Sequence, residues 1–233
     1  FQNFEKASDL LLKSIPIAEK KQKKSIYSLY LSTKASYCYS SALNNRGSEE
    51  ILDKNWWQKV KGFFAEKPNL NDELFKEAEN CFKQLVQITK EKSGENSSEY
   101  LVSLNQLASF YGSIGNFYLA QKNYNEALSI LKPNKETNKD LYYSTLLNST
   151  SVELNKNANQ FTLEELEKYY YQKLTDNYLF LTENEKVSFS LNTERKFEII
   201  NSIYINLGNE KSGVHLYNNT LALKNIALYS NQN

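Results

Sequence analysis

The sequence predicts an all-α fold, a superhelical array of antiparallel helix pairs, and three observations predict it. First, the chain of 233 residues contains only 3 proline and 7 glycine residues. A β-sandwich or barrel of this length needs many turns, which use these residue types, so their shortage favours long helices joined by few loops. Second, apolar residues recur at helical spacing over much of the chain. Third, a pattern in its centre repeats every 42 residues.

The composition is that of a globular protein without a strong charge. Hydrophobic residues make up 40% and charged residues 24%, which argues against disorder. The net charge of +1 provides no overall attraction to nucleic acid or to an anionic membrane, so we expect no nucleic-acid partner. The basic run Lys20–Lys24 is either a local basic patch or, as is usual for such runs, a solvated helix face.

No apolar stretch approaches the roughly 20 residues that span a bilayer, so we expect no membrane insertion. The chain begins with Phe1 and contains no methionine. We therefore expect it to be a processed or excised portion of a longer protein. The missing start could have included a targeting peptide. The compartment stays open, with the cytoplasm favoured.

The N-terminal part, residues 1–92, is helical but irregular. Two sets of apolar residues fit helices, Phe4, Ala7 and Leu11 for one and Ile26, Leu29, Ala35, Tyr39 and Ala42 for the other. An irregular insertion, residues 45–71, contains Trp56-Trp57 and Phe63-Phe64. Because aromatic area is costly to leave in water, we favour a plug packed against the adjacent helices over an exposed partner-binding knob.

The clearest unit, residues 100–133, predicts a helix, a tight turn at Gly112–Asn116 and a second helix. Its spaced residues are Leu104, Leu107, Ala108 and Tyr111 before the turn, and Ala120, Tyr124, Ala127 and Leu131 after it. The three alanines let the helix backbones approach, and the two tyrosines fill the groove between neighbouring pairs.

Partial copies of this unit flank it. Ala78, Phe82 and Leu85 stand 42 residues before Ala120, Tyr124 and Ala127, and Tyr142 and Leu146 stand 42 residues after Tyr100 and Leu104. Each helix pair exposes an apolar face that only the next pair can cover, so one repeat alone is not expected to fold.

This pattern resembles the tetratricopeptide repeat (TPR), whose signature is large-x2-L-G-x2-Y, then A-x3-F, then a small residue and proline. The eight matching positions are Leu104, Leu107, Ala108, Tyr111, Ala120, Tyr124, Ala127 and Pro133. The period exceeds the standard of about 34 residues, and the extra residues fall at 94–98 and 134–140, as in the long repeats of kinesin light chains. The resemblance implies a right-handed TPR-type α-solenoid that binds proteins, and it weakens after Leu147, where Ser149 and Thr150 replace the Leu-Ala pair.

Residues 156–233 change in character. Thr162–Glu165 and Thr182–Glu185 are capping-box patterns that predict two helix starts, the first helix running through Leu181. Two more helical stretches follow, around residues 197–207 and 216–229. We therefore divide the chain into residues 1–92, the best-matched repeat units 93–155 and a C-terminal helical connector or cap 156–233 packed on the array.

The segments Tyr178–Lys186 and Leu216–Leu228 resemble the helical connector that joins TPR arrays to the CHAT domain, a caspase-like cysteine protease fold, in bacterial proteins. The resemblance covers roughly the last 70 residues. It implies that the repeat array senses or holds a partner, while the catalytic His and Cys belong to a domain beyond Asn233.

No residue pattern predicts catalysis, a cofactor or a metal site. Cys38 and Cys81 lack CxxC spacing and a nearby histidine, so we expect buried, inert thiols. His215, the only histidine, is expected to be an ordinary helix residue near a turn. No phosphate-binding, dinucleotide-binding, serine-hydrolase or zinc-protease motif occurs. For Tyr169–Tyr171 we favour core packing over a stacking platform, since consecutive helix residues point about 100° apart.

The candidate partner-binding residues are the first-helix positions that the repeat does not use for packing. They are Val102, Asn105, Ser109 and Ser113, with Ser144 and Leu147 in the next unit. We expect them to line a concave face that binds a peptide or folded protein, although they could equally face solvent. The leading function is the sensor or scaffold part of a larger bacterial signalling protein, ahead of a free-standing adaptor and an unrecognised hydrolase.

Overall fold

The computed structural model describes residues 10, 28–29, 31–36, 38–39, 73–152, 159–178, 181–208 and 210–230. These residues form helices and their connecting turns, and no strand occurs among them. The basic run 20–24, the aromatic insertion 45–71 and the pattern at Phe4, Ala7 and Leu11 lie outside the described residues, as do Ile26 and Ala42. Leu29, Ala35 and Tyr39 are helical, and Ala35 is buried.

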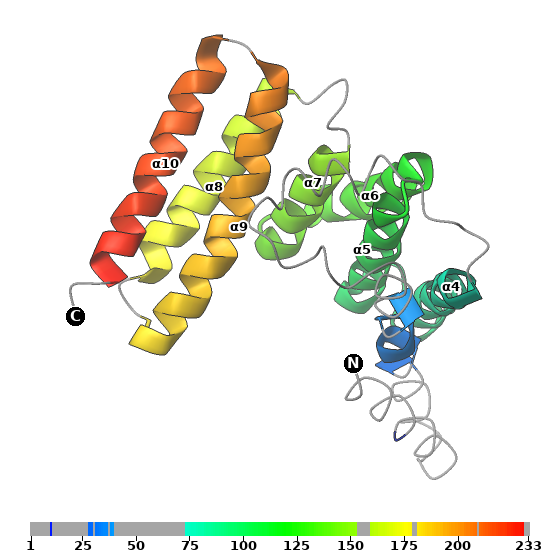
Figure 1. Ribbon diagram of the computed structural model, residues 1–233. Helices are drawn as coiled ribbons and strands as arrows, with labels where there is room; N and C mark the ends of the chain where they lie inside the picture. The colour runs from blue at the N-terminus through cyan, green and yellow to red at the C-terminus, as the bar shows by residue number, and fades with distance from the viewer. Residues whose placement is uncertain are drawn as a thin grey trace. The chain divides into compact units, whose positions relative to one another are not determined.

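The chain divides into two compact units, Phe1–Ile130 and Leu131–Asn233. The helices in Figure 1 are α4 (Glu73–Ser93), α5 (Ser98–Ser113), α6 (Phe117–Leu131), the 3-10 turn η1 (Lys132–Asn134), α7 (Lys139–Val152), α8 (Gln160–Tyr178), α9 (Glu183–Leu207) and α10 (Glu210–Ser230). The boundary between the units falls inside the predicted segment 93–155, and the division at residues 92 and 155 stays a prediction.

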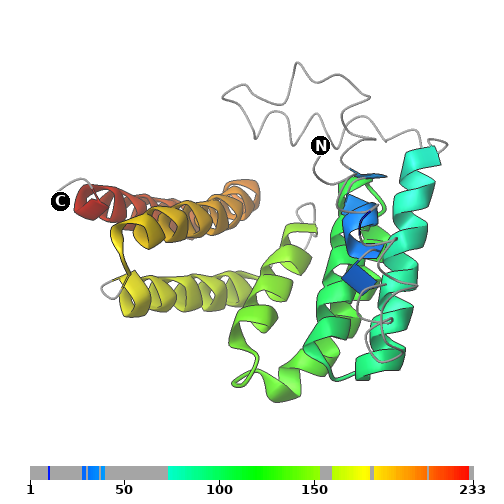
Figure 2. The same cartoon turned by 90° about the horizontal axis from the view of Figure 1, so that it is seen from below.

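In the first unit, α4 and α5 lie side by side and antiparallel (Figures 1 and 2). Thr89 near the end of α4 shares a 2.8 Å hydrogen bond with Ser103 near the start of α5. At the other end of the pair, the Tyr111 hydroxyl donates to Glu79 at 2.9 Å. The pairing of late with early residues is the register of two antiparallel helices.

The predicted repeat positions form the core of α5 and α6. The aliphatic and tyrosine side chains of the pattern are nearly inaccessible, and Ala108, Ala120 and Ala127 have no exposed surface at all. Because these three positions are fully enclosed, a side chain larger than a methyl group would have no free space there, which explains the alanines. The predicted all-α architecture of antiparallel helix pairs is therefore confirmed for the described residues.

The turn between α5 and α6 follows from its glycine. Gly115 has a φ of +76°, a left-handed conformation that a side chain would strain. Its conformation allows the Asn116 amide to donate back to the Tyr111 carbonyl at 2.8 Å, which satisfies the end of α5. The chain then enters α6 within two residues.

In the second unit, the helices α8, α9 and α10 lie alongside one another in both views. The capping box predicted at Thr182 is confirmed, with the Thr182 amide donating to Glu185 at 2.9 Å. Gly208, with a φ of +58°, ends α9 and permits the turn into α10. Both C-terminal helices contain the stretches predicted for them.

The capping box predicted at Thr162 is wrong. Helix α8 begins two residues earlier, at Gln160. The Asn159 side chain accepts from the Phe161 amide at 3.0 Å, and the Asn159 carbonyl accepts from the Thr162 amide at 2.9 Å. Asparagine is a strong helix-capping residue, and it takes the capping position before Thr162 can. The helix also ends at Tyr178, short of the predicted Leu181.

Among the described helices, none is both long and apolar enough to cross a membrane.

Candidate functional site

The α5 face, defined as Val102, Asn105, Ser109 and Ser113, is the predicted partner-binding surface of the first unit. Val102 is 42% exposed and Ser109 is exposed, whereas Asn105 and Ser113 are half-buried. Val102 and Ser109 stand seven residues apart, which is two helical turns, so they lie on the same side of α5. The α5 face thus offers one apolar side chain and one hydroxyl to a partner.

The polar groups of the α5 face already bond within the helix pair. The Asn105 amide donates to the Leu101 carbonyl at 3.0 Å, and the Ser113 hydroxyl donates to the Phe110 carbonyl at 2.6 Å. Ser109 shares a 2.8 Å hydrogen bond with the hydroxyl of Tyr124. Since a serine hydroxyl has one donor and two acceptor positions, Ser109 retains capacity for a partner.

The two remaining candidates lie in the second unit, on α7, and one of them is a correction. Ser144 is half-buried and donates to the Leu141 carbonyl at 3.1 Å. Leu147 has no exposed surface, so its side chain is not available to a partner. Tyr143 and Thr150, four before and three after Leu147, are also buried, which puts position 147 on the inner side of α7. A leucine at the position where α5 carries Asn105 turns that position into core.

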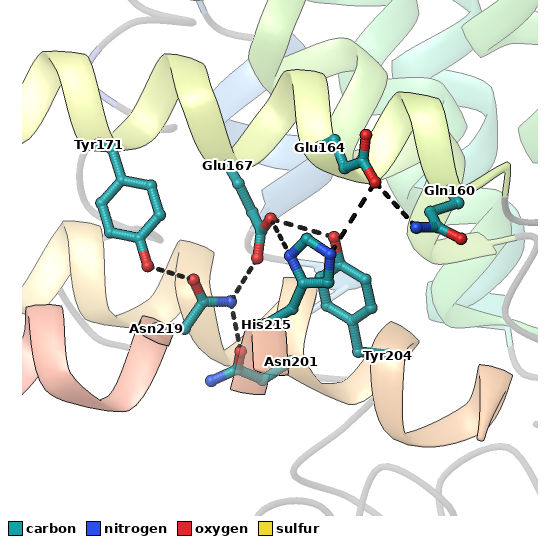
Figure 3. Close-up of polar contacts among 8 residues, drawn as sticks. All are labelled: Gln160, Glu164, Glu167, Tyr171, Asn201, Tyr204, His215 and Asn219. Carbon is teal, nitrogen blue, oxygen red and sulfur yellow. Dashed lines mark hydrogen bonds and ion pairs between the residues drawn. The ribbon is translucent and has the colours of Figure 1, made fainter. Parts of the chain in front are cut away.

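A second group of functional-looking residues lies between α8, α9 and α10 (Figure 3). Glu167 of α8 is only 6% exposed. One carboxylate oxygen accepts from the Tyr204 hydroxyl of α9 at 3.0 Å and lies 2.8 Å from Nδ1 of His215. The other accepts from the Asn219 amide of α10 at 2.8 Å. Because an ionised carboxylate only accepts, the His215 proton is assigned to Nδ1.

Asn219 extends these contacts. It has no exposed surface, and its amide also donates to Asn201 at 2.7 Å while its oxygen accepts from the Tyr171 hydroxyl at 2.5 Å. The His215 ring lies flat on the Tyr204 ring, with centroids 4.5 Å apart and planes 6° apart. We call the six residues Glu167, Tyr171, Asn201, Tyr204, His215 and Asn219 the Glu167 network; it takes side chains from all three helices.

The electrostatics of the Glu167 network keep its tyrosines protonated. Burial, followed by the charge of Glu167, raises the pKa of Tyr171 to about 12. The same two causes, with the hydrogen bond to Glu167, raise the pKa of Tyr204 well above its usual value. Both hydroxyls therefore remain donors at neutral pH. A buried carboxylate that accepts three hydrogen bonds has its capacity taken up by the protein, which is typical of a structural group.

The sequence placed His215 in a helix near a turn, which the structure shows, but did not reveal its contact with Glu167. The available signal is helical spacing: Glu167 and Tyr171 are four residues apart, as are His215 and Asn219. Polar residues at such spacing share one helix face. Their contacts across 48 residues of chain depend on packing that no local pattern contains.

The consecutive tyrosines of α8 point to different neighbours, as expected for packing. Tyr170 is buried, Tyr171 bonds to Asn219, and Tyr169 stacks on Tyr143 with centroids 3.8 Å apart. No shared platform is formed by the three rings.

The two thiols are buried and unlinked, as predicted. Burial, followed by the charge of Glu77, raises the pKa of Cys38 to about 12. Burial likewise raises the pKa of Cys81. Within the described residues, no three His, Cys, Asp or Glu side chains are grouped to hold a metal ion.

Comparison with known proteins gives likenesses among solved structures, and these include two crystal structures. No protein-family description matches the chain, and no curated protein matches it. The crystal structure of BtubC (BKLC) from P. vanneervenii is 14% identical, with 98% of this chain and 81% of that chain covered and a TM-score of 0.49. A protein from Podosopora anserina described as a kinesin light chain with nearly identical TPR-like repeats is 11% identical, with 99% and 98% covered and a TM-score of 0.45. With both TM-scores below 0.5, neither likeness assigns this chain to a family.

Proposed function

We propose that this chain is a non-catalytic helical-repeat scaffold that binds another protein through the α5 face. The observation that carries the proposal is the exposure of Val102 and Ser109 on one side of α5, while most of the residues between them are buried. A rigid helix pair that presents an accessible face is the usual platform for protein recognition in repeat arrays.

The chemistry of the α5 face suits a peptide or a protein loop. Val102 supplies a small apolar contact that a partner can desolvate, and Ser109 supplies a hydrogen-bonding group two turns away. Asn105 lies between them, held by its bond to the Leu101 carbonyl.

The test compares two exposed apolar residues of the first unit. Val102→Asp alters the α5 face, and Tyr118→Asp alters a residue of α6 that is 78% exposed. We expect Val102→Asp to weaken capture of the partner from the lysate of the native host at least fivefold. The reason is that binding of the partner would remove water from the new carboxylate. Tyr118→Asp should leave capture unchanged, and both variants should keep the wild-type thermal melt. If only Tyr118→Asp abolished capture, the binding surface would lie on α6 and not on the α5 face.

The finer proposal is that this scaffold is the sensor part of a larger bacterial signalling protein that controls a CHAT protease. Its support is the resemblance of residues 178–186 and 216–228 to the connector that precedes such domains. The alternative is a free-standing TPR adaptor that tethers partners. Reading the parent gene separates them: a downstream caspase-like segment with its own His and Cys supports the sensor, and a stop codon soon after Asn233 supports the adaptor.

A hydrolase is the least supported alternative. The single histidine bonds to a buried carboxylate that also holds Tyr204 and Asn219, an arrangement that suits structure better than proton transfer to a substrate. Hydrolysis of a substrate by the purified chain, abolished by His215→Ala, would establish catalysis and overturn the scaffold proposal.

A further inference from the structure

A polar groove of about 490 Å³ lies in the second unit, apart from the Glu167 network. One wall is α8, and the other is formed by residues 135–143, where η1 leads into α7. Four lysine and four carboxylate side chains line the groove, so its formal charge is balanced. A balanced groove favours a ligand that carries both charges over a simple anion or cation.

The groove has a firm base because its inner groups hold one another. Lys135 donates to Glu165 at 2.5 Å and lies 4.9 Å above the Tyr143 ring. Tyr143 in turn stacks on Tyr169. Near the other end, Lys173 donates to Asp140 at 2.5 Å, and this bond is the main reason that the pKa of Asp140 is lowered. These paired charges join α8 to residues 135–140, with the buried Tyr143 ring and the half-buried Tyr169 ring between them.

The remaining groove residues of α8 are arranged as a ladder. Lys168, Gln172 and Asp176 are all exposed and stand four residues apart, so they follow one stripe of the helix. None of their side chains bonds to another residue within the described part of the chain. The α8 ladder therefore presents a cation, an amide and a carboxylate, in that order, to whatever enters the groove.

We propose that the groove binds an extended peptide segment in which an acidic and a basic residue stand four positions apart. Lys168 and Asp176 are eight residues apart, which is about 12 Å along a helix at 1.5 Å per residue. An extended chain advances about 13 Å in four residues and returns its side chains to the same side. The acidic residue then pairs with Lys168 and the basic residue with Asp176.

Gln172 accounts for the middle of the segment. Its amide has both donor and acceptor groups, which match the N–H and C=O of a peptide backbone. A helical ligand fits less well, since a helix about 10 Å across would fill the groove volume in roughly one turn and could not reach both ends of the ladder. The inferred partner is therefore an extended, mixed-charge segment of a protein.

The probe is a fluorescein-labelled peptide with one Glu and one Lys four positions apart in a Gly/Ser background, measured by fluorescence polarisation at low salt. The comparison peptides carry two Glu or two Lys at the same positions. We expect the full chain to bind the mixed peptide saturably and about tenfold more tightly than either comparison peptide. Gln172→Ala should weaken binding of the mixed peptide without changing the order of affinities among the three peptides.

Charge reversals make the test specific. Lys168→Glu should transfer preference to the peptide with two Lys, and Asp176→Lys should transfer it to the peptide with two Glu. The matched control is Lys211→Glu, the same reversal at an exposed position of α10 outside the groove, which should retain the wild-type preference. Absence of saturable binding of the mixed peptide, or an order of preference that none of the groove variants changes, would overturn the proposal. Such a result would leave the proposal that the α5 face binds a partner untouched, because that proposal is tested with other residues.

Discussion

Nδ1 of His215 lies 2.8 Å from the Oε2 atom of the buried Glu167, and the two residues come from helices that are not consecutive in the chain. The same carboxylate bonds to Tyr204 and Asn219, so one side chain of α8 holds both α9 and α10. Each of these bonds can form only when its helix has a particular rotation about its own axis and a particular position along that axis. The contact therefore determines the register in which α10 packs.

Removing the carboxylate should loosen the second unit. Glu167→Ala removes the acceptor of the buried Tyr204 hydroxyl and one of the two acceptors of the buried Asn219 amide, at a cost of about 2–4 kcal/mol of unfolding free energy. Hydrogen exchange followed by mass spectrometry should show faster exchange in α8, α9 and α10 and unchanged exchange in α4 and α5. Glu164→Ala is the control, because Glu164 is half-buried and lies 3.9 Å from His215 Nε2. Equal effects of the two variants would show that the Glu167 network does not set this stability.

High pH should destabilise the fold through its tyrosines. Burial is the first cause that raises the pKa of Tyr124 and of Tyr111 to about 12, whereas the ordinary tyrosine value is 10.0. Above pH 10 the unfolded chain has therefore lost protons that the folded chain still holds, so the unfolding free energy falls as pH rises from about 10 to about 12. Urea unfolding between pH 8 and pH 11.5 checks this expectation. A flat profile across that range would contradict the burial of these hydroxyls.

A larger residue at a fully buried alanine should weaken the first unit. Ala108 has no exposed surface, and Ala108→Leu adds three carbons where two helices meet. The expected loss is about 1–3 kcal/mol of unfolding free energy, seen as a lower thermal midpoint. Ser129→Leu at an exposed position of α6 also enlarges the side chain and should lower the midpoint little. Tolerance of leucine at position 108 would argue against close packing of this pair.

Both cysteines should resist modification in the folded protein. The pKa of Cys38 is raised to about 12, mainly by burial, and burial also raises that of Cys81, so neither supplies thiolate at pH 8. We expect Ellman's reagent to titrate no thiol in the native chain within minutes and both thiols in guanidinium chloride. Prompt reaction of either thiol in the native chain would mean that its surroundings open readily.

The repeat was predictable because its determinants are local. Leu104, Ala108 and Tyr111 lie on one helix face, and Ala120 and Tyr124 face them after a turn that Gly115 makes possible. Spacing and residue size encode this arrangement directly, so both the helices and their buried faces follow from sequence.

The site was less predictable because burial depends on neighbours that sequence does not reveal. Val102 and Leu147 are both apolar first-helix residues, yet one is exposed and the other is buried. The period of 42 related position 147 to position 105, but the side chain there follows the packing of α7. The Glu167 network and the α8 ladder likewise come from helix rotations that only the folded chain establishes.

The central claim, that the α5 face binds a partner protein, is tested most directly by site-specific photo-crosslinking. Benzoylphenylalanine is placed at position 102 or 109, or at position 125 on the exposed side of α6, and each protein is irradiated in the lysate of the native host. The account predicts one discrete adduct of higher mass from positions 102 and 109 and none from position 125. An adduct from position 125 with none from positions 102 and 109 would contradict the account.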